Sequence, residues 1–185
     1  MLFRSGEALP IMRGMLDGTE PTAAGPHYVA KTVRNLPAPV QKHLPILIGG
    51  GGEQVTLKLV AKYGDANNVS GTPEQVAHKE EVLLKHCETI GRDPKTIERT
   101  VGIGNVVIRN DAAEAMRIHQ AQFAANGINP AWDKQPVGSV EQVIEHLAPY
   151  LQLGYRHLIA GFSTPHDEES MIRFAEEVRP ALEKI

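Results

Sequence analysis

Four consecutive glycines, Gly49 to Gly52, form the stretch of this sequence whose residue types best suit ligand chemistry. They follow the apolar run Pro45-Ile46-Leu47-Ile48, which is typical of a strand buried on both faces of a parallel sheet. Glu53 and Gln54 come next and open a segment that reaches Tyr63 with apolar residues at helical spacing. The pattern predicts a strand, a glycine turn and a helix in succession.

A glycine turn at the start of a helix can bind an anion. Residues without a Cβ let backbone N–H groups approach a ligand, and the first N–H groups of a helix are unpaired and partly positive. The stretch therefore predicts a phosphate site, whereas the alternative is that the glycines only permit a tight turn. It matches neither G-x-G-x-x-G nor G-x-x-x-x-G-K-[ST], which argues against a nucleoside triphosphate.

The motifs around the glycines carry a family resemblance. P-I-L-I-G-G-G-G, then L-V-A-K-Y, then G-D-A-N-N resemble the phosphate-binding segment of the bacterial luciferase-like monooxygenase superfamily. Within that superfamily they are most similar to the branch of oxidoreductases that depend on coenzyme F420, a deazaflavin. The resemblance implies a (β/α)8 barrel, a cofactor at the carboxyl ends of the strands, and hydride transfer to or from an organic substrate.

The resemblance also implies which residues hold the cofactor. The positions that match the phosphate-contacting motif are Gly49, Gly50, Gly51, Gly52, Glu53 and Gln54. The cofactor expected there is coenzyme F420, with FMN as the alternative, because both place a phosphate at this turn. No catalytic residue is carried over. Asp65 matches a family position that we expect to fix the start of a strand.

The rest of the chain alternates strand and helix patterns. Residues 1–18 predict a leading helix, residues 19–44 an irregular excursion rich in proline and glycine, and residues 45–185 the strand–helix units. Four such units are expected near residues 45–64, 65–90, 99–126 and 156–184, with an additional helix at 139–153. This alternation predicts a single partial-barrel domain of about four parallel strands, the C-terminal half of a (β/α)8 TIM barrel.

Helix boundaries follow from local signals. Thr72, Asp111 and Ser139 each precede a helical pattern and are expected to be N-caps. Pro10 lies inside the leading helix, so we expect a kink there or a helix that begins near Leu9.

Four strands leave two edges of a barrel unpaired. The chain could be a fragment of a longer product, a half-barrel completed by a second copy, or a rearranged open sheet. We hypothesise a homodimer that completes the open edges. The strands that would carry most of the active site are absent, so the alternative function is a non-catalytic half-barrel remnant that at most binds a phosphate-bearing ligand.

Composition excludes several function classes. Hydrophobic residues make up 42% of the chain and the net charge is −3, so neither nucleic acid nor an anionic membrane is an expected partner. A single cysteine, Cys87, excludes an intrachain disulfide and is expected to be a small buried residue. With no long apolar run and no signal-peptide pattern, a cytoplasmic protein acting on a small molecule is expected.

Other chemistry-bearing residues give weaker indications. The eight histidines show no metal-ligand spacing, and a metal site is not expected, although His78 and His86 could share a helix face. His27 and Tyr28 could line a ligand mouth or lie in a surface β-ribbon. Ser163, Thr164 and His166, in the loop after the last strand, are candidate substrate contacts. Trp132 lies in a separate loop and could cover a pocket or pack at an edge of the fold.

Overall fold

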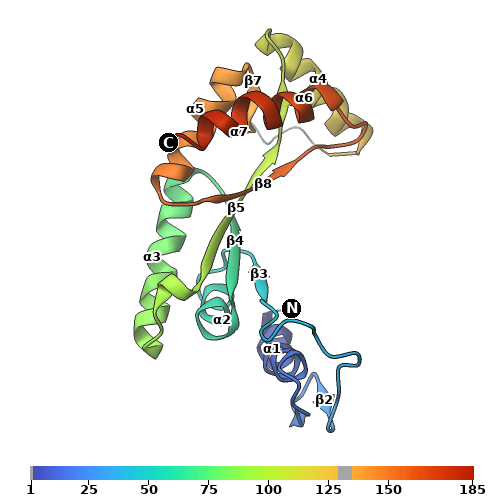
Figure 1. The fold of residues 1–185 in the computed structure, drawn as a ribbon, viewed down its shortest axis with the longest axis vertical. Coiled ribbons are helices and arrows are strands. Elements are labelled where there is room, and N and C mark those ends of the chain that lie inside the picture. The colour runs from blue at the N-terminus through green and yellow to red at the C-terminus, as the bar shows by residue number, and fades with distance from the viewer. Residues whose placement is uncertain (1, 129–134) are drawn as a thin grey trace. The chain divides into compact units, whose positions relative to one another are not determined.

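A computed structural model describes residues 2–128 and 135–185, so Trp132 lies outside the described residues. The chain forms two compact units. Unit 1 comprises residues 1–69 and 78–99, and unit 2 comprises residues 70–77 and 100–185. The elements, most of which are labelled in Figure 1, are α1 (Leu2–Leu16), β1 (Ala23–Ala24), β2 (Val29–Ala30), β3 (Leu47–Gly49), α2 (Thr56–Tyr63), β4 (Ala66–Ser70), α3 (Pro73–Ile90), η1 (Pro94–Thr96), β5 (Glu98–Asn105), β6 (Val107–Ile108), α4 (Ala112–Ala125), β7 (Val137–Gly138), α5 (Val140–Gln152), β8 (His157–Gly161), α6 (Glu168–Arg173), η2 (Phe174–Val178) and α7 (Arg179–Leu182).

The largest sheet has the strand order β3-β4-β5-β8. β3 pairs with β4 in parallel, with Leu47 opposite Ala66, and β5 pairs with β8 in parallel, with Thr100 opposite His157. Within the described residues this sheet has four strands, and helices follow the strands as the alternating pattern predicts. The predicted α/β architecture of four parallel strands with flanking helices is confirmed.

The core of unit 1 forms where α2 meets α3. Val60 and Ala61 of α2 pack with three buried residues from α3 and the segment after it, Leu83, Cys87 and Ile97. Cys87 is fully buried, and this burial raises the pKa of its thiol, so the prediction of a small buried residue is confirmed. Arg92 donates from its guanidinium to the carbonyl groups of Val60, Ala61 and Gly64, which satisfies the carboxyl end of α2.

Asp65 fixes the start of β3, as expected from the sequence. Its carboxylate accepts the backbone N–H of Ile46 at 2.7 Å and lies 2.8 Å from Nε2 of His43. Arg13 of α1 donates to the same carboxylate at 3.1 Å. Burial alone would raise the pKa of Asp65, but the hydrogen bonds from Ile46 and His43 and the charge of Arg13 hold it below its ordinary value.

An ion pair with little exposure to solvent links β6 to α6 in unit 2. Arg109, which follows β6, donates to the carboxylate of Asp167 at 2.8 Å, and the two side chains are 13% and 9% exposed. Ser170 donates to the same carboxylate at 2.5 Å and accepts the backbone N–H of Ile108 at 2.8 Å. Asp167 is also the N-cap of α6, so one carboxylate joins the start of that helix to β6.

Two expected helix starts are wrong. The leading helix begins at Leu2 and continues through Pro10, where the sequence left open a kink at Pro10 or a start near Leu9, and the later start is excluded. Pro10 is exposed, so water can bond to the carbonyl group that lacks an amide donor. The second predicted helix begins at Thr56, and Glu53 and Gln54 belong to the preceding turn.

The three predicted N-caps are confirmed. Asp111 accepts the backbone N–H of Ala113 at 2.9 Å. Ser139 and Gln142 form a complete capping box at the start of α5. Thr72 shows the same reciprocal pattern with Gln75 at the start of α3.

Candidate functional site

The glycine turn begins where β3 ends. Gly49 is the last residue of β3, opposite Asn68 of β4, and the N–H of Gly50 donates to the carbonyl of Asn68 at 2.8 Å. Gly50 has φ +113°, a backbone conformation that residues with a side chain adopt only with strain. The chain leaves the sheet at this residue because glycine permits the bend.

Asn67 of β4 holds the turn in place. Its side-chain amide donates to the carbonyl of Ile48 at 2.8 Å and to that of Gly50 at 3.2 Å, and the residue is only 4% exposed. Sequence reasoning treated Asn67 as part of a short strand and missed this role. The available signal is a strongly polar residue in a strand that is otherwise buried, since buried polar groups are hydrogen-bonded.

The backbone N–H groups that follow are available to a ligand. In the described part of the chain, the N–H groups of Gly51, Gly52, Glu53 and Gln54 donate to no acceptor. The start of α2 also has no side-chain cap. Four successive donors without an acceptor therefore lie ahead of a helix whose dipole adds partial positive charge, and the start of a helix with unpaired N–H groups is a place where a phosphate or carboxylate group can bind.

The glycines add no side chain of their own to this turn. A Cβ added to Gly49 would meet no atom within 4 Å, so open space lies beside it. A Cβ on Gly52 would lie 2.9 Å from Oγ1 of Thr56, and one on Gly51 would lie 2.6 Å from Cδ of Lys79. The turn thus has open space at its start and close side-chain neighbours at its end.

Helix α3 lies against the same turn. Nε2 of His86 donates to the carbonyl of Glu53 at 2.8 Å, and Nε2 of His78 lies 3.1 Å from the Glu53 carboxylate. These are the two histidines whose eight-residue spacing suggested a shared helix face. Among residues 2–128 and 135–185 no group of three or more metal-ligating side chains is present. The pair of histidines orients Glu53.

The loop after β8 is tied to its own unit. The backbone N–H of Ser163 donates to the side chain of Asn105 at 2.7 Å, and Thr164 donates to Asn126 at 3.1 Å. Asn105 is buried beside His119 and Gln122, and burial lowers the pKa of His119. These contacts fix the carboxyl ends of β5 and β8. Two of the three candidate substrate contacts in this loop therefore bond to unit 2, and the glycine turn belongs to unit 1.

The excursion between α1 and β3 contains a surface β-ribbon, in agreement with the simpler of the two readings of His27 and Tyr28. β1 and β2 pair antiparallel, and the Glu7 carboxylate accepts the backbone N–H groups of His27 and Tyr28. His27 Nδ1 lies 2.8 Å from the same carboxylate. These contacts lower the pKa of Glu7, above all the hydrogen bond with His27.

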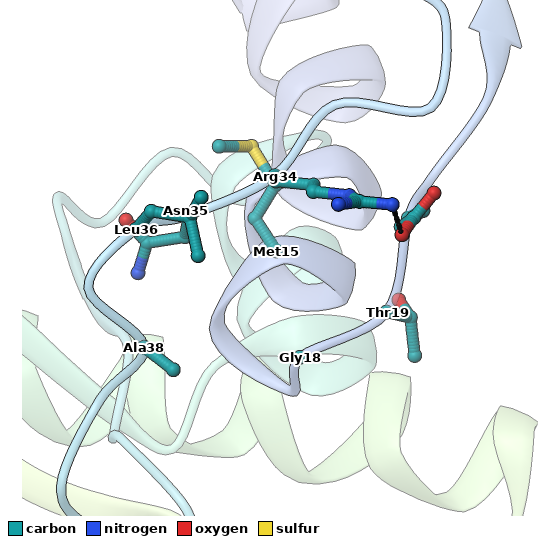
Figure 2. A pocket seen from close by; sticks show the side chains of 8 residues that line it. Met15, Gly18, Thr19, Arg34, Asn35, Leu36 and Ala38 are labelled. Carbon is teal, nitrogen blue, oxygen red and sulfur yellow. Dashed lines mark ion pairs between the residues drawn. The ribbon is translucent and has the colours of Figure 1, made fainter.

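A cavity of about 260 Å³ lies between the end of α1 and the excursion (Figure 2). Its walls include Met15, Leu36 and Arg34, and the guanidinium of Arg34 is paired with Glu20. Both polar and apolar residues line the cavity, and the charge of its guanidinium is balanced by Glu20. The glycine turn is the stronger candidate site.

Comparison with known proteins identifies the family of this chain. The model of the luciferase-like monooxygenase family matches residues 2–137. No curated protein sequence matches the chain. Among the described residues, no helix is long and apolar enough to cross a membrane.

Three solved structures illustrate the similarity. An F420-dependent secondary alcohol dehydrogenase in complex with an F420–acetone adduct superposes with a TM-score of 0.79 at 20% identity over 98% of this chain and 62% of its own. The coenzyme F420-dependent tetrahydromethanopterin reductase from Methanopyrus kandleri gives 0.75 at 14% identity, over 98% and 63%. A riboflavin lyase with modified FMN and riboflavin gives 0.74 at 13% identity, over 99% and 57%. The similarity confirms a TIM-barrel fold, of which this chain spans less than two thirds.

Proposed function

Because the chain belongs to the luciferase-like monooxygenase family, we propose that its glycine turn binds the phosphate of a deazaflavin or flavin cofactor. The observation that carries the proposal is the set of four backbone N–H groups, from Gly51 to Gln54, that have no acceptor in the described structure. Gly49 and Gly50 complete the proposed site by shaping the exit from β3. Coenzyme F420 is the preferred cofactor, because the Ile48–Gly52 motif resembles that branch, and FMN is the alternative.

The chain's own residues would bind and orient the cofactor. The turn amides hold the phosphate, and Asn67 keeps the turn at the carboxyl end of β3. When bound, the cofactor would supply hydride transfer to or from an organic substrate. We assign no catalytic residue in this chain.

One observation favours a second candidate function. The sheet has four strands within the described residues, and the chain spans 57–63% of the solved structures compared above. A barrel enzyme builds its active site from the loops of all its strands. The alternative is therefore a half-barrel without catalytic activity that binds a phosphate-bearing ligand.

A second copy of the chain could complete the sheet. β3 and β8 are the terminal strands of the sheet order, and Leu47 and Ile159 on them are 49% and 39% exposed. Unpaired strand edges with exposed apolar side chains favour association. We propose a homodimer. Light scattering at micromolar protein concentration tests the oligomeric state, and a monomer would contradict the proposal.

We also propose a location in the cytoplasm, in keeping with the free and buried Cys87.

The cofactor proposal is tested by titrating the 185-residue chain with coenzyme F420 and with FMN while following cofactor fluorescence. Riboflavin and the deazaflavin core without phosphate are the matched controls. We expect binding that requires the phosphate. Equal binding with and without phosphate, or no binding of either cofactor, would refute the role of the turn. If binding occurs, loss of reduced-cofactor absorbance on addition of simple ketones or aldehydes separates the enzyme from the half-barrel without activity.

A further inference from the structure

Thr56, the first residue of α2, directs its side chain at the glycine turn. The residue is only 8% exposed. A Cβ built on Gly52 would lie 2.9 Å from Oγ1 of Thr56, and one built on Gly50 would lie 3.5 Å from its Cγ2. Both branches of this side chain therefore lie against the turn, with the hydroxyl group beside Gly52.

The hydroxyl of Thr56 has no hydrogen-bond partner among the described residues. Thr89 of α3 shows a common arrangement, in which the hydroxyl donates to the carbonyl four residues earlier, here that of Lys85 at 2.8 Å. For Thr56 the corresponding carbonyl is that of Gly52, which accepts the N–H of Leu57 at 3.0 Å instead. Because a hydroxyl removed from water without a partner costs free energy, this donor requires an acceptor that the described residues do not supply.

The oxygen of this hydroxyl can still be reached from solvent. Each fully buried side-chain nitrogen or oxygen atom of the described residues has a hydrogen-bond partner. Oγ1 of Thr56 has none, so it retains accessible surface although the residue as a whole is buried. A threonine side chain is stiff because it branches at Cβ, and the packing around Thr56 holds its hydroxyl in place.

The charged group of the turn does not compete for this donor. The carboxylate of Glu53 lies 3.1 Å from Nε2 of His78, and the Glu53 side chain is 44% exposed. A hydroxyl is neutral, so it can donate to an anion at the turn without needing a free counter-charge in the protein. Its hydrogen bond to a charged oxygen is stronger than one to a neutral acceptor.

We propose that Oγ1 of Thr56 donates a hydrogen bond to the phosphate group that binds the glycine turn. The proposal rests on the proposed function and deepens it, because it adds a side chain to a set of donors that otherwise comes from the backbone. The hydroxyl of Thr56 and the N–H of Gly52 lie side by side at the start of α2, so two oxygens of one phosphate can accept from them.

The test compares binding of FMN with binding of riboflavin in four forms of the full chain. Thr56→Val replaces the hydroxyl by a methyl group of similar size, and it should weaken FMN binding about tenfold while riboflavin binding stays the same. Thr56→Ser keeps the hydroxyl and should retain most of the affinity. Thr89→Val is the matched control, because it removes the hydroxyl of an exposed helical threonine, and it should bind FMN as the unaltered chain does.

Thermal unfolding without cofactor separates a ligand from a structural group. Because the Thr56 hydroxyl has no partner among the described residues, Thr56→Val should unfold at the same temperature as the unaltered chain or higher. A lower midpoint would show that the hydroxyl bonds within the protein and would overturn the proposal. If Thr56→Val binds FMN as tightly as the unaltered chain, Thr56 is not a ligand, while the cofactor proposal stands. If the unaltered chain binds FMN and riboflavin equally, the cofactor proposal fails and this one with it.

Discussion

Two of the turns that connect a strand to a helix through glycine differ in whether their backbone N–H donors are paired. β3 leads through Gly50, with φ +113°, to α2, and β7 ends at Gly138, with φ +149°, before α5. Before α5, Ser139 and Gln142 form a capping box. Before α2 there is no side-chain cap, and in the described structure four N–H groups have no acceptor.

The two turns differ in the space beside their glycines. A Cβ on Gly138 would collide with the Gln142 side chain, so the protein's own atoms fill that space. A Cβ on Gly49 would meet nothing within 4 Å. Glycine shapes the backbone at both turns, but only the turn before α2 leaves donors and space for a guest. A ligand that accepts from these donors in the folded state alone would add stability to the protein.

The largest predicted effect concerns a cap in unit 2. Asp167→Ala removes the N-cap of α6 and the nearer of the two carboxylates that pair with Arg109, the other being Glu169 at 3.3 Å. Loss of one partner of a buried pair costs about 3–5 kcal/mol, and because Glu169 remains we expect the free energy of unfolding in urea to fall by an amount at the lower end of that range. The matched control is Asp111→Ala, which removes a cap without an ion pair and should cost about 1 kcal/mol. Similar losses in the two variants would contradict this account of Asp167.

The loss of stability at low pH should be no larger than that of Asp167→Ala, because protonation of Asp167 weakens the contacts that the substitution removes. Burial alone would raise the pKa of Asp167, but hydrogen bonds from Arg109 and Ser170 and the charge of Arg109 hold it below its ordinary value. A carboxylate with a lowered pKa in the folded state stabilises the fold above its unfolded pKa of about 4. That stability is lost as the pH falls through the lower, folded value. Urea unfolding below pH 4 should show this loss, and Asp167→Asn should reduce its slope; an unchanged slope would refute it.

The contrast between the turns also shows how far the sequence leads. Ser139 and Asp111 were predicted as caps because the signal is local: a short polar residue, then a helical pattern. The pairing of Arg109 with Asp167 joins residues 58 positions apart, so no local pattern indicates it. The path of α1 through Pro10 depends on its exposure to solvent, which the residue type does not reveal.

For the candidate site too, the sequence predicted the local turn and not the contacts made by distant residues. The glycine run placed the turn and its link to the following helix correctly. Whether a given N–H is available depends on strand pairing, since Asn68 of β4 takes the donor of Gly50. The contacts of Lys79 and His86 with the turn arise only when α3 folds against it. The assignment of Gly49, Gly50, Gly51, Gly52, Glu53 and Gln54 to a phosphate remains a prediction.

Gly50→Ala tests both the backbone conformation of the glycine turn and its proposed binding of phosphate. A side chain at φ +113° strains the backbone by about 1–3 kcal/mol, which thermal unfolding would report as a lower midpoint. Because the turn would also shift away from Asn68, phosphate-dependent binding of FMN should weaken. Gly49→Ala is the matched control, since a Cβ there meets no atom within 4 Å. If Gly50→Ala is as stable as Gly49→Ala, the strained conformation is not required.

Ser139→Ala should have a smaller effect and none on binding. The variant loses the hydrogen bond from the N–H of Gln142 and breaks the capping box, which costs about 1 kcal/mol of unfolding free energy. Ser139→Asp retains an acceptor at the cap and should restore most of the loss. A change in phosphate-dependent cofactor binding in Ser139→Ala, at temperatures where the variant is folded, would break the distinction between the two turns.

The smallest predicted change in stability makes the turn before α2 resemble the one before α5. Gly52→Asp places a carboxylate beside the unpaired N–H groups, and an acidic side chain at a helix start stabilises by about 0.3–1 kcal/mol. The new side chain must displace Oγ1 of Thr56, so the net gain falls at the lower end. The carboxylate would occupy the place of the phosphate, and FMN should then bind no better than riboflavin. Gly52→Asn matches the size without the charge, and it should lose less phosphate-dependent binding than Gly52→Asp. Equal losses in the two variants would mean that crowding alone blocks the turn, and the electrostatic basis of the site would have to be given up.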